Sequence, residues 1–149
     1  MSFSFARKLG VVIGFLLAAN SATGNAFAQQ CTPATTTAMP LNNTTVICTG
    51  TVTNQNTPNG YGTGVETGLT INVQANATVT ATANFGQGIS VGNGNTINNR
   101  GTITGANLGI LANDAATDTL TVNNNSTSSK IVGLAGVDVQ SGGIALVNL

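Results

Sequence analysis

The 149-residue sequence has no histidine and no tryptophan, and only four basic and four acidic side chains. Without histidine, Ser-His-Asp and Cys-His catalytic arrangements and His-ligated metal sites are excluded. The Gly-Gly-x-Gly-x-Asp repeat that binds calcium in some solenoids is also absent. The sequence therefore predicts no catalytic residue, no metal site and no cofactor in this chain.

Charge and aromatic residues are scarcest beyond the first 28 positions. Arg7 and Lys8 precede that point, so residues 29–149 keep Arg100 and Lys130 against four carboxylates, a net charge of about two negatives. Four of the five Phe also lie before residue 29, leaving one Phe and one Tyr. Because basic patches and stacking rings are the usual means of holding nucleic acid, we predict no nucleic-acid partner.

The N-terminal segment has the three parts of a secretory signal. Arg7 and Lys8 precede a mostly apolar run over 9–19, and small and polar residues follow as far as Ala28. The alternative is a membrane-spanning helix, but eleven residues rise only about 16 Å, against a hydrocarbon core of about 30 Å. We predict a signal peptide over 1–28, cleaved between Ala28 and Gln29.

Cleavage there would place a cysteine close to the new N-terminus. A lipid anchor on Cys31 is disfavoured, because lipoprotein signals have a small residue where this chain has Gln30. We therefore expect export without a lipid, to the cell surface, the outer membrane or the extracellular space.

Residues 29–66 contain both cysteines and all three prolines. Two cysteines in an exported chain predict a disulfide between Cys31 and Cys48, with two free thiols as the alternative. Closing that loop would stabilise the fold by about 3 kcal/mol in the chain-entropy model. Strand signals at 44–47 and 49–53 predict a hairpin-like cap, and a cap is what the first coil of a stacked structure needs to cover its edge.

From residue 67 to residue 149, an apolar position returns at a nearly fixed interval. Leu69, Ile89, Ile110 and Ile131 recur at intervals of about 20 residues. Such a period is typical of stacked coils, each too small to bury its apolar face alone. We predict an all-β, parallel β-solenoid over 67–149, with these four side chains in one continuous inner row. A disordered polar tract is the alternative, and the recurring apolar residues disfavour it.

Short β-branched segments alternate with turns of Asn and Gly. The predicted strands cover residues 69–73, 77–82, 88–91, 96–98, 102–104, 109–111, 119–122, 130–132, 137–139 and 144–147. In these strands apolar side chains would point inward and Thr hydroxyls outward. The asparagines at 93, 95, 98, 99 and 123–125 would form turns and hydrogen-bonded ladders between equivalent positions of the coils.

The run from Asn95 to Gly105, followed by Gly109-Ile110, resembles the rungs of bacterial autotransporter passenger domains. These repeat an Ile-x-Asn-x-Gly-x-Ile-x-Gly theme around a right-handed β-helix. Cys31-Thr32-Pro33 and Val46-Ile47-Cys48-Thr49-Gly50 are similar to the start of such passengers. The resemblance implies a right-handed parallel β-helix, incomplete at Leu149. It also implies type V secretion and a downstream outer-membrane β-barrel that these 149 residues do not contain.

Two functions follow as expectations. The first is a structural or adhesive role as a surface-displayed passenger, whose partner is a copy of itself, a host surface or the extracellular matrix. The second is the N-terminal part of a β-helix enzyme acting on polysaccharide, with its catalytic residues outside this chain. Such enzymes use paired carboxylates, and a pair within this chain would have to come from Asp114, Asp118 and Asp138. Their turn and strand-face positions favour solvated side chains, so we favour the first function.

Overall fold

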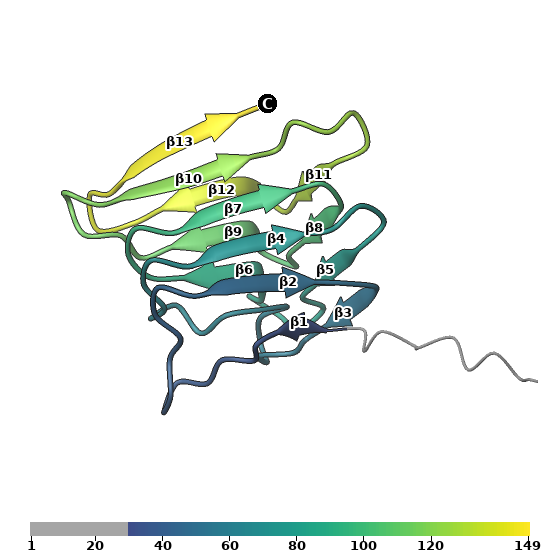
Figure 1. Cartoon of the computed structure of the whole chain (residues 1–149), viewed down its shortest axis with the longest axis horizontal. Helices are drawn as coiled ribbons and strands as arrows, with labels where there is room; N and C mark the ends of the chain where they lie inside the picture. Colours follow the sequence, from purple (N-terminus) through teal and green to yellow (C-terminus); the bar gives the residue numbers. More distant parts are fainter. Residues whose placement is uncertain (1–29) are drawn as a thin grey trace, which may run out of the picture.

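The computed structural model describes residues 30–149, in which every regular element is a β-strand (Figure 1). The predicted signal peptide and its cleavage site between Ala28 and Gln29 lie outside the described residues. Within them, no helix has the length and apolarity needed to cross a membrane. The strands are β1 (Cys31–Thr32), β2 (Thr45–Cys48), β3 (Thr51–Thr53), β4 (Thr70–Val73), β5 (Thr78–Thr80), β6 (Gln87–Val91), β7 (Thr96–Asn99), β8 (Thr102–Thr104), β9 (Leu108–Ala112), β10 (Thr119–Asn123), β11 (Lys130–Val132), β12 (Ala135–Val139) and β13 (Ile144–Asn148).

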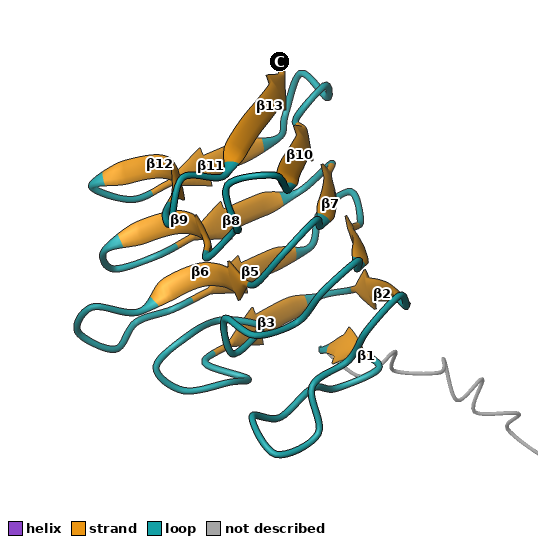
Figure 2. Cartoon of the chain, turned by 90° about the vertical axis from the view of Figure 1, so that its left-hand side faces the viewer, coloured by secondary structure: helices purple, strands orange, loops and turns teal. Residues whose placement is uncertain are grey.

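The strands form three sheets that run along one stack (Figure 2). The first sheet has the order β1-β2-β4-β7-β10-β13, the second β11-β8-β5-β3 and the third β12-β9-β6. Apart from the antiparallel pair β1 and β2, every pairing between these strands is parallel. The chain is thus an all-β parallel β-solenoid of about four turns, which confirms the predicted fold class.

The strand positions follow from the alternation of side chains. Every predicted strand between 69 and 147 overlaps an observed strand, and the bounds differ by one or two positions at most. In β4, β7 and β10, buried positions alternate with half-buried ones, as expected for a strand with one face toward a core.

The length of a coil differs from the predicted period. In the first sheet, equivalent asparagines are 26, 25 and 25 residues apart. The step from Ile89 to Ile110, which pair in the third sheet, is shorter and agrees with the predicted spacing. The predicted period is therefore wrong for the stack as a whole, because the turns between sheets differ in length from coil to coil.

The predicted single inner row is also wrong. Ile89 pairs with Ile110 in the third sheet, but Ile131 pairs with Ile103 in the second, and Leu69 precedes β4 of the first. When an apolar residue recurs at an interval shorter than the number of residues in one coil, each recurrence falls earlier in its coil than the one before. It therefore comes to lie in a different sheet. Each sheet contributes at least one inner row: Val46-Ile71-Ile97-Val122 in the first, Val52-Val79-Ile103-Ile131 in the second and Tyr61-Ile89-Ile110-Val137 in the third.

The cap is smaller than predicted. The segments predicted as a hairpin over 44–53 are β2 and β3, which pair in parallel with β4 and β5 and so belong to the first coil. The covering layer is β1 with the loop over 33–42, and the predicted disulfide between Cys31 and Cys48 joins it to β2. The hairpin prediction was wrong because periodicity alone does not distinguish strands that pair with each other from strands that pair with the next coil.

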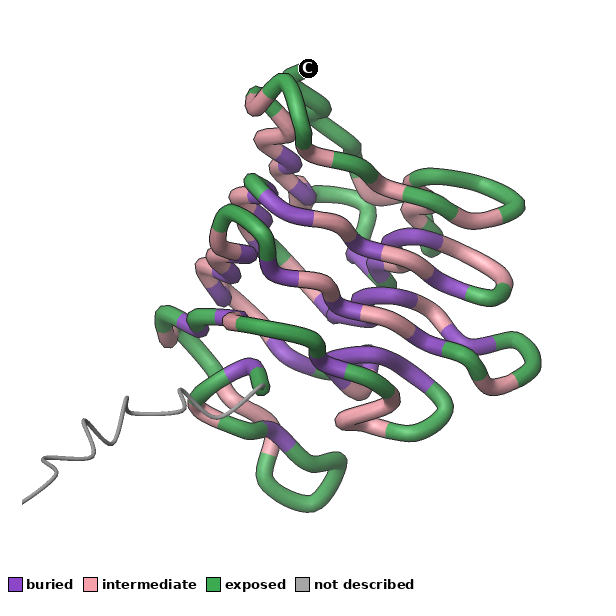
Figure 3. The backbone as a smooth tube through the Cα atoms, turned by 90° about the vertical axis from the view of Figure 1, so that its right-hand side faces the viewer, coloured by how far each residue is buried: buried purple, intermediate pink, exposed green. Residues whose placement is uncertain are grey.

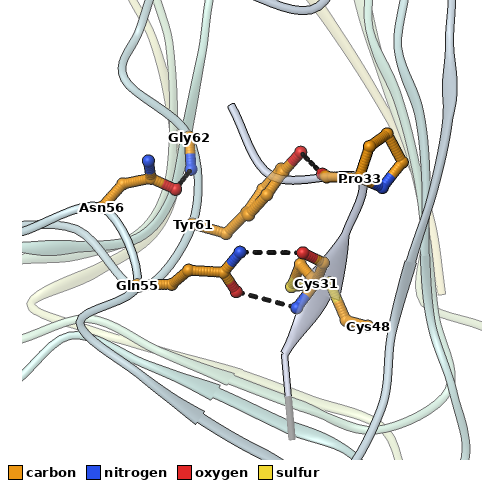
Figure 4. Close-up of a disulfide and its surroundings, with 7 residues drawn as sticks. All are labelled: Cys31, Pro33, Cys48, Gln55, Asn56, Tyr61 and Gly62. Atoms are coloured by element: carbon orange, nitrogen blue, oxygen red, sulfur yellow. Dashed lines mark hydrogen bonds between the residues drawn. A yellow bond between two sulfur atoms is a disulfide. The ribbon is translucent and has the colours of Figure 1, made fainter. Parts of the chain in front are cut away.

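Polar side chains hold the cap in place (Figure 4). The Gln55 amide makes two hydrogen bonds with the Cys31 backbone: it donates from Nε2 to the carbonyl and accepts at Oε1 from the N–H, both at 2.8 Å. The buried Tyr61 hydroxyl donates to the Pro33 carbonyl at 3.0 Å. Burial, and secondarily the charge of Glu66, raises the pKa of Tyr61. The hydroxyl therefore stays protonated and can donate this hydrogen bond. The disulfide and these bonds tie the cap to the first coil.

Candidate binding surface

The three candidate aspartates do not gather at one site, and the predicted solvated position is wrong for Asp114. Asp114 lies between β9 and β10 and is fully buried; its Oδ1 accepts from the Gly94 N–H at 3.0 Å, and its Oδ2 has no hydrogen-bond partner. Burial, with a contribution from Asp118, raises the pKa of Asp114, against the opposing effect of the Gly94 and Leu120 amides. Asp138 lies on β12 and accepts from Gln140. Asp114 and Asp118 are thus neighbours, Asp138 belongs to another element, and none of the three lines a groove described below.

Glu66, which sequence reasoning did not single out, is a second buried carboxylate, and its role is structural. It accepts from the N–H and hydroxyl of Thr63, from the Gly64 and Val65 N–H groups and from the Thr35 hydroxyl, at 2.7 to 3.2 Å. These bonds close the last turn of the first coil and attach the cap loop to it. A carboxylate surrounded by donors in this way has no capacity left for a ligand.

The outer face of the first sheet carries a continuous row of asparagine amides. Asn98 donates to Asn72 at 2.9 Å, Asn123 donates to Asn98 at 2.8 Å, and Asn148 donates to Asn123 at 2.6 Å. Stacked strands are about 4.8 Å apart, which sets the repeat of this row. We call these four side chains the amide row. The row confirms the predicted ladder of asparagines, although its members at 72 and 148 were not among the predicted residues.

Two other asparagines are structural, because they face the core and spend their hydrogen bonds mainly on backbone. Asn95 accepts from the Leu69 N–H and donates to three carbonyls of the neighbouring turns. Asn99 donates to Asn124 and to the Lys130 carbonyl, and accepts from the Gly101 N–H. Both are fully buried. Outward-facing and inward-facing asparagines therefore have different roles, which composition alone does not separate.

A groove of about 390 Å³ lies where β4, β7 and β10 end. The arrowheads in Figure 1 mark these strand ends. Three members of the amide row contribute to its wall, and Arg100 lies beside them. A smaller groove of about 100 Å³ adjoins it and also includes Arg100. The residues that line the larger groove are Asn72, Val73, Gln74, Asn98, Asn99, Arg100, Asn123 and Asn125.

The lining is almost entirely amide and guanidinium groups. Such groups make hydrogen bonds but neither move protons near neutral pH nor attack a substrate. In residues 30–149, no group of three His, Cys, Asp or Glu side chains is arranged to hold a metal ion. The arrangement is therefore suited to binding a polar ligand.

The chain matches no protein-family model, no curated protein and no solved structure. The fold and the groove are thus the basis for any statement of function.

Proposed function

We propose that this chain is the capped, N-terminal part of an exported solenoid with a structural and adhesive role, of the kind found in autotransporter passenger domains. The observation that carries the proposal is the amide row beside the polar groove, a repeated array of hydrogen-bonding groups on the outside of the stack. A disulfide-linked cap supports it as well, because disulfides persist in oxidising compartments outside the cytoplasm.

The alternative, part of an enzyme acting on polysaccharide, has less support. A glycosidase needs two carboxyl groups on either side of a bound sugar. Asp114 is buried, and the grooves contain no carboxylate. We therefore propose binding without catalysis for these residues.

Exposure on intact cells tests the proposal. Antibody raised against residues 29–149 should label intact cells of the source organism, and added protease should remove the label. An antibody against a periplasmic protein, used in parallel, should label only permeabilised cells. Labelling of this chain that also requires permeabilisation would contradict the proposed display.

A further inference from the structure

The amide row retains unused hydrogen-bonding capacity. An asparagine side chain has two N–H donors and two acceptor lone pairs. Asn98 and Asn123 each donate once to the coil below and accept once from the coil above. One donor and one acceptor therefore remain on each amide, repeated about every 4.8 Å along the stack. A ligand with hydroxyl groups, which both donate and accept, matches this array.

Arg100 adds a positive charge at the same place. It is exposed, it lines both grooves, and none of the described carboxylates forms an ion pair with it. A guanidinium presents a planar fork of donors that fits a carboxylate or an oxyanion through two parallel hydrogen bonds. An unpaired guanidinium beside amides favours a ligand that carries an anionic group as well as hydroxyls.

Charge is separated across the molecule in a way that favours such a ligand. Arg100 and Lys130, the basic residues of the described chain, lie between the first and second sheets or at the start of the second. The acidic residues lie elsewhere: Glu66, Asp114 and Asp118 between the third and first sheets, and Asp138 on β12. The groove is thus on the positive side of a chain whose net charge is negative, where an anion is attracted.

We propose that the larger groove binds an anionic saccharide, with ligand hydroxyls on the amide row and a carboxylate or sulfate on Arg100. This inference deepens the adhesive role proposed above and rests on it, since the ligand would be met outside the cell. Nucleic acid shares the anionic and hydroxylated chemistry, but its bases need aromatic surfaces that the groove lacks.

Titration calorimetry on the chain recovered after export tests the proposal. The probes are an oligogalacturonate, which carries carboxylates, a heparin-derived oligosaccharide, which carries sulfates, and a neutral malto-oligosaccharide of equal length. We expect at least one anionic probe to bind, weakening as salt increases, and the neutral probe not to bind at the same concentration. The two anionic probes distinguish carboxylate from sulfate as the preferred group.

Two variants with the same change in net charge locate the site. Arg100→Gln should weaken binding about tenfold or more, because it removes a charge-assisted bidentate contact. Lys130→Gln removes an exposed charge that lines neither groove, so it should weaken binding less than about threefold. Both substitutions are at exposed positions, and unchanged thermal unfolding would establish that both variants fold.

Equal weakening in both variants would overturn the proposal, because it would mean attraction by net charge alone. So would equal binding of the neutral probe or of a single-stranded oligonucleotide, or no binding of either anionic probe. Surface labelling of intact cells is scored separately. Absent binding with normal labelling rejects this ligand only, whereas absent labelling rejects the proposed display.

Discussion

Ile110 is a residue whose burial the fold depends on directly. It is 0% exposed and lies in an inner row between Ile89 and Val137. Burial of such a side chain is worth about 2 to 3 kcal/mol, and an asparagine there would add an amide without partners. We expect Ile110→Asn to lower the free energy of unfolding by about 4 kcal/mol or more, measured by urea denaturation.

The matched control for this change is Ile144→Asn, on β13. Ile144 is 56% exposed, so the same substitution should cost less than about 1 kcal/mol. Similar losses at the two positions would contradict the assignment of Ile110 to the core.

Asp114 makes stability depend on pH. Burial raises its pKa in the folded chain above the ordinary value of 3.8, so the folded state holds the proton more tightly than the unfolded state does. The stability associated with the protonated form is fully present below pH 3.8 and is lost as pH rises through the raised pKa. Asp114→Asn, which cannot ionise, should therefore be more stable than the parent chain at pH 7, with the difference shrinking toward pH 3.

Denaturation curves recorded from pH 3 to pH 7 check this expectation. Asp138→Asn is the control, because it also removes one negative charge, from a strand-face residue that contacts Gln140. A loss of stability in Asp114→Asn at pH 7 would mean that the carboxylate makes stabilising contacts in its charged form.

The third sheet contains a row of glycines whose surroundings differ only at the top of the stack. Gly88, Gly109 and Gly136 occupy equivalent positions in β6, β9 and β12. A Cβ on Gly109 would lie 2.5 Å from the Gly136 carbonyl oxygen and 2.5 Å from Ile131 Cγ2, whereas at Gly136 the nearest atom is 4.0 Å away. Gly109→Ala should thus destabilise the chain by about 2 kcal/mol or more, through overpacking.

Gly136→Ala, the matched control, should change thermal stability little. The steric difference arises because β9 has a coil on both sides, while β12 is the edge of its sheet. If both substitutions lowered the melting temperature equally, the order of strands in the third sheet would be in question.

The sequence patterns predicted where the strands lie better than which strands pair with each other. Strands such as β8 and β11 were predicted with their observed bounds, because Thr-Ile-Thr and Lys-Ile-Val alternate in a way that depends only on neighbouring residues. The disulfide was predictable because two cysteines allow one pairing. The length of each coil was not predictable, because it depends on turns whose lengths vary and whose residues carry no periodic signal.

For the binding surface as well, the sequence predicted local features but not which residues lie side by side. The ladder of asparagines was predictable as a type of contact, but its members at 72 and 148 and the groove beside Arg100 were not. They depend on which strands lie side by side. That register follows from the true length of each coil, which the recurring apolar positions did not give.

The two ends of the stack differ, because further chain covers the first coil but not the last coil of residues 30–149. The cap lies over the first coil, whereas much of the last coil, near the C-terminus in Figure 3, is exposed. The exposed apolar side chains of this coil include Leu134 at 87% and Leu146 at 52%. Edge strands with exposed apolar residues tend to pair with another chain. Because only one end of residues 30–149 is open, we expect a protein of residues 29–149 alone to form closed dimers and not filaments.

Analytical ultracentrifugation at low micromolar concentration checks this expectation. Ile144→Lys combined with Leu146→Lys should shift the chain toward monomer, since charged side chains block pairing at an edge. A monomer in the parent chain would contradict the expected pairing, and filaments would mean that the cap does not protect the first coil.

The measurement that tests the stack most directly is methyl nuclear Overhauser spectroscopy on the exported chain with labelled isoleucines. The parallel pairing of successive coils places Ile71 beside Ile97 and Ile103 beside Ile131. We expect strong cross-peaks for both pairs, whose members are distant in sequence and meet only when the coils stack in this register. Absence of both cross-peaks in a folded sample would contradict the parallel solenoid described for this chain.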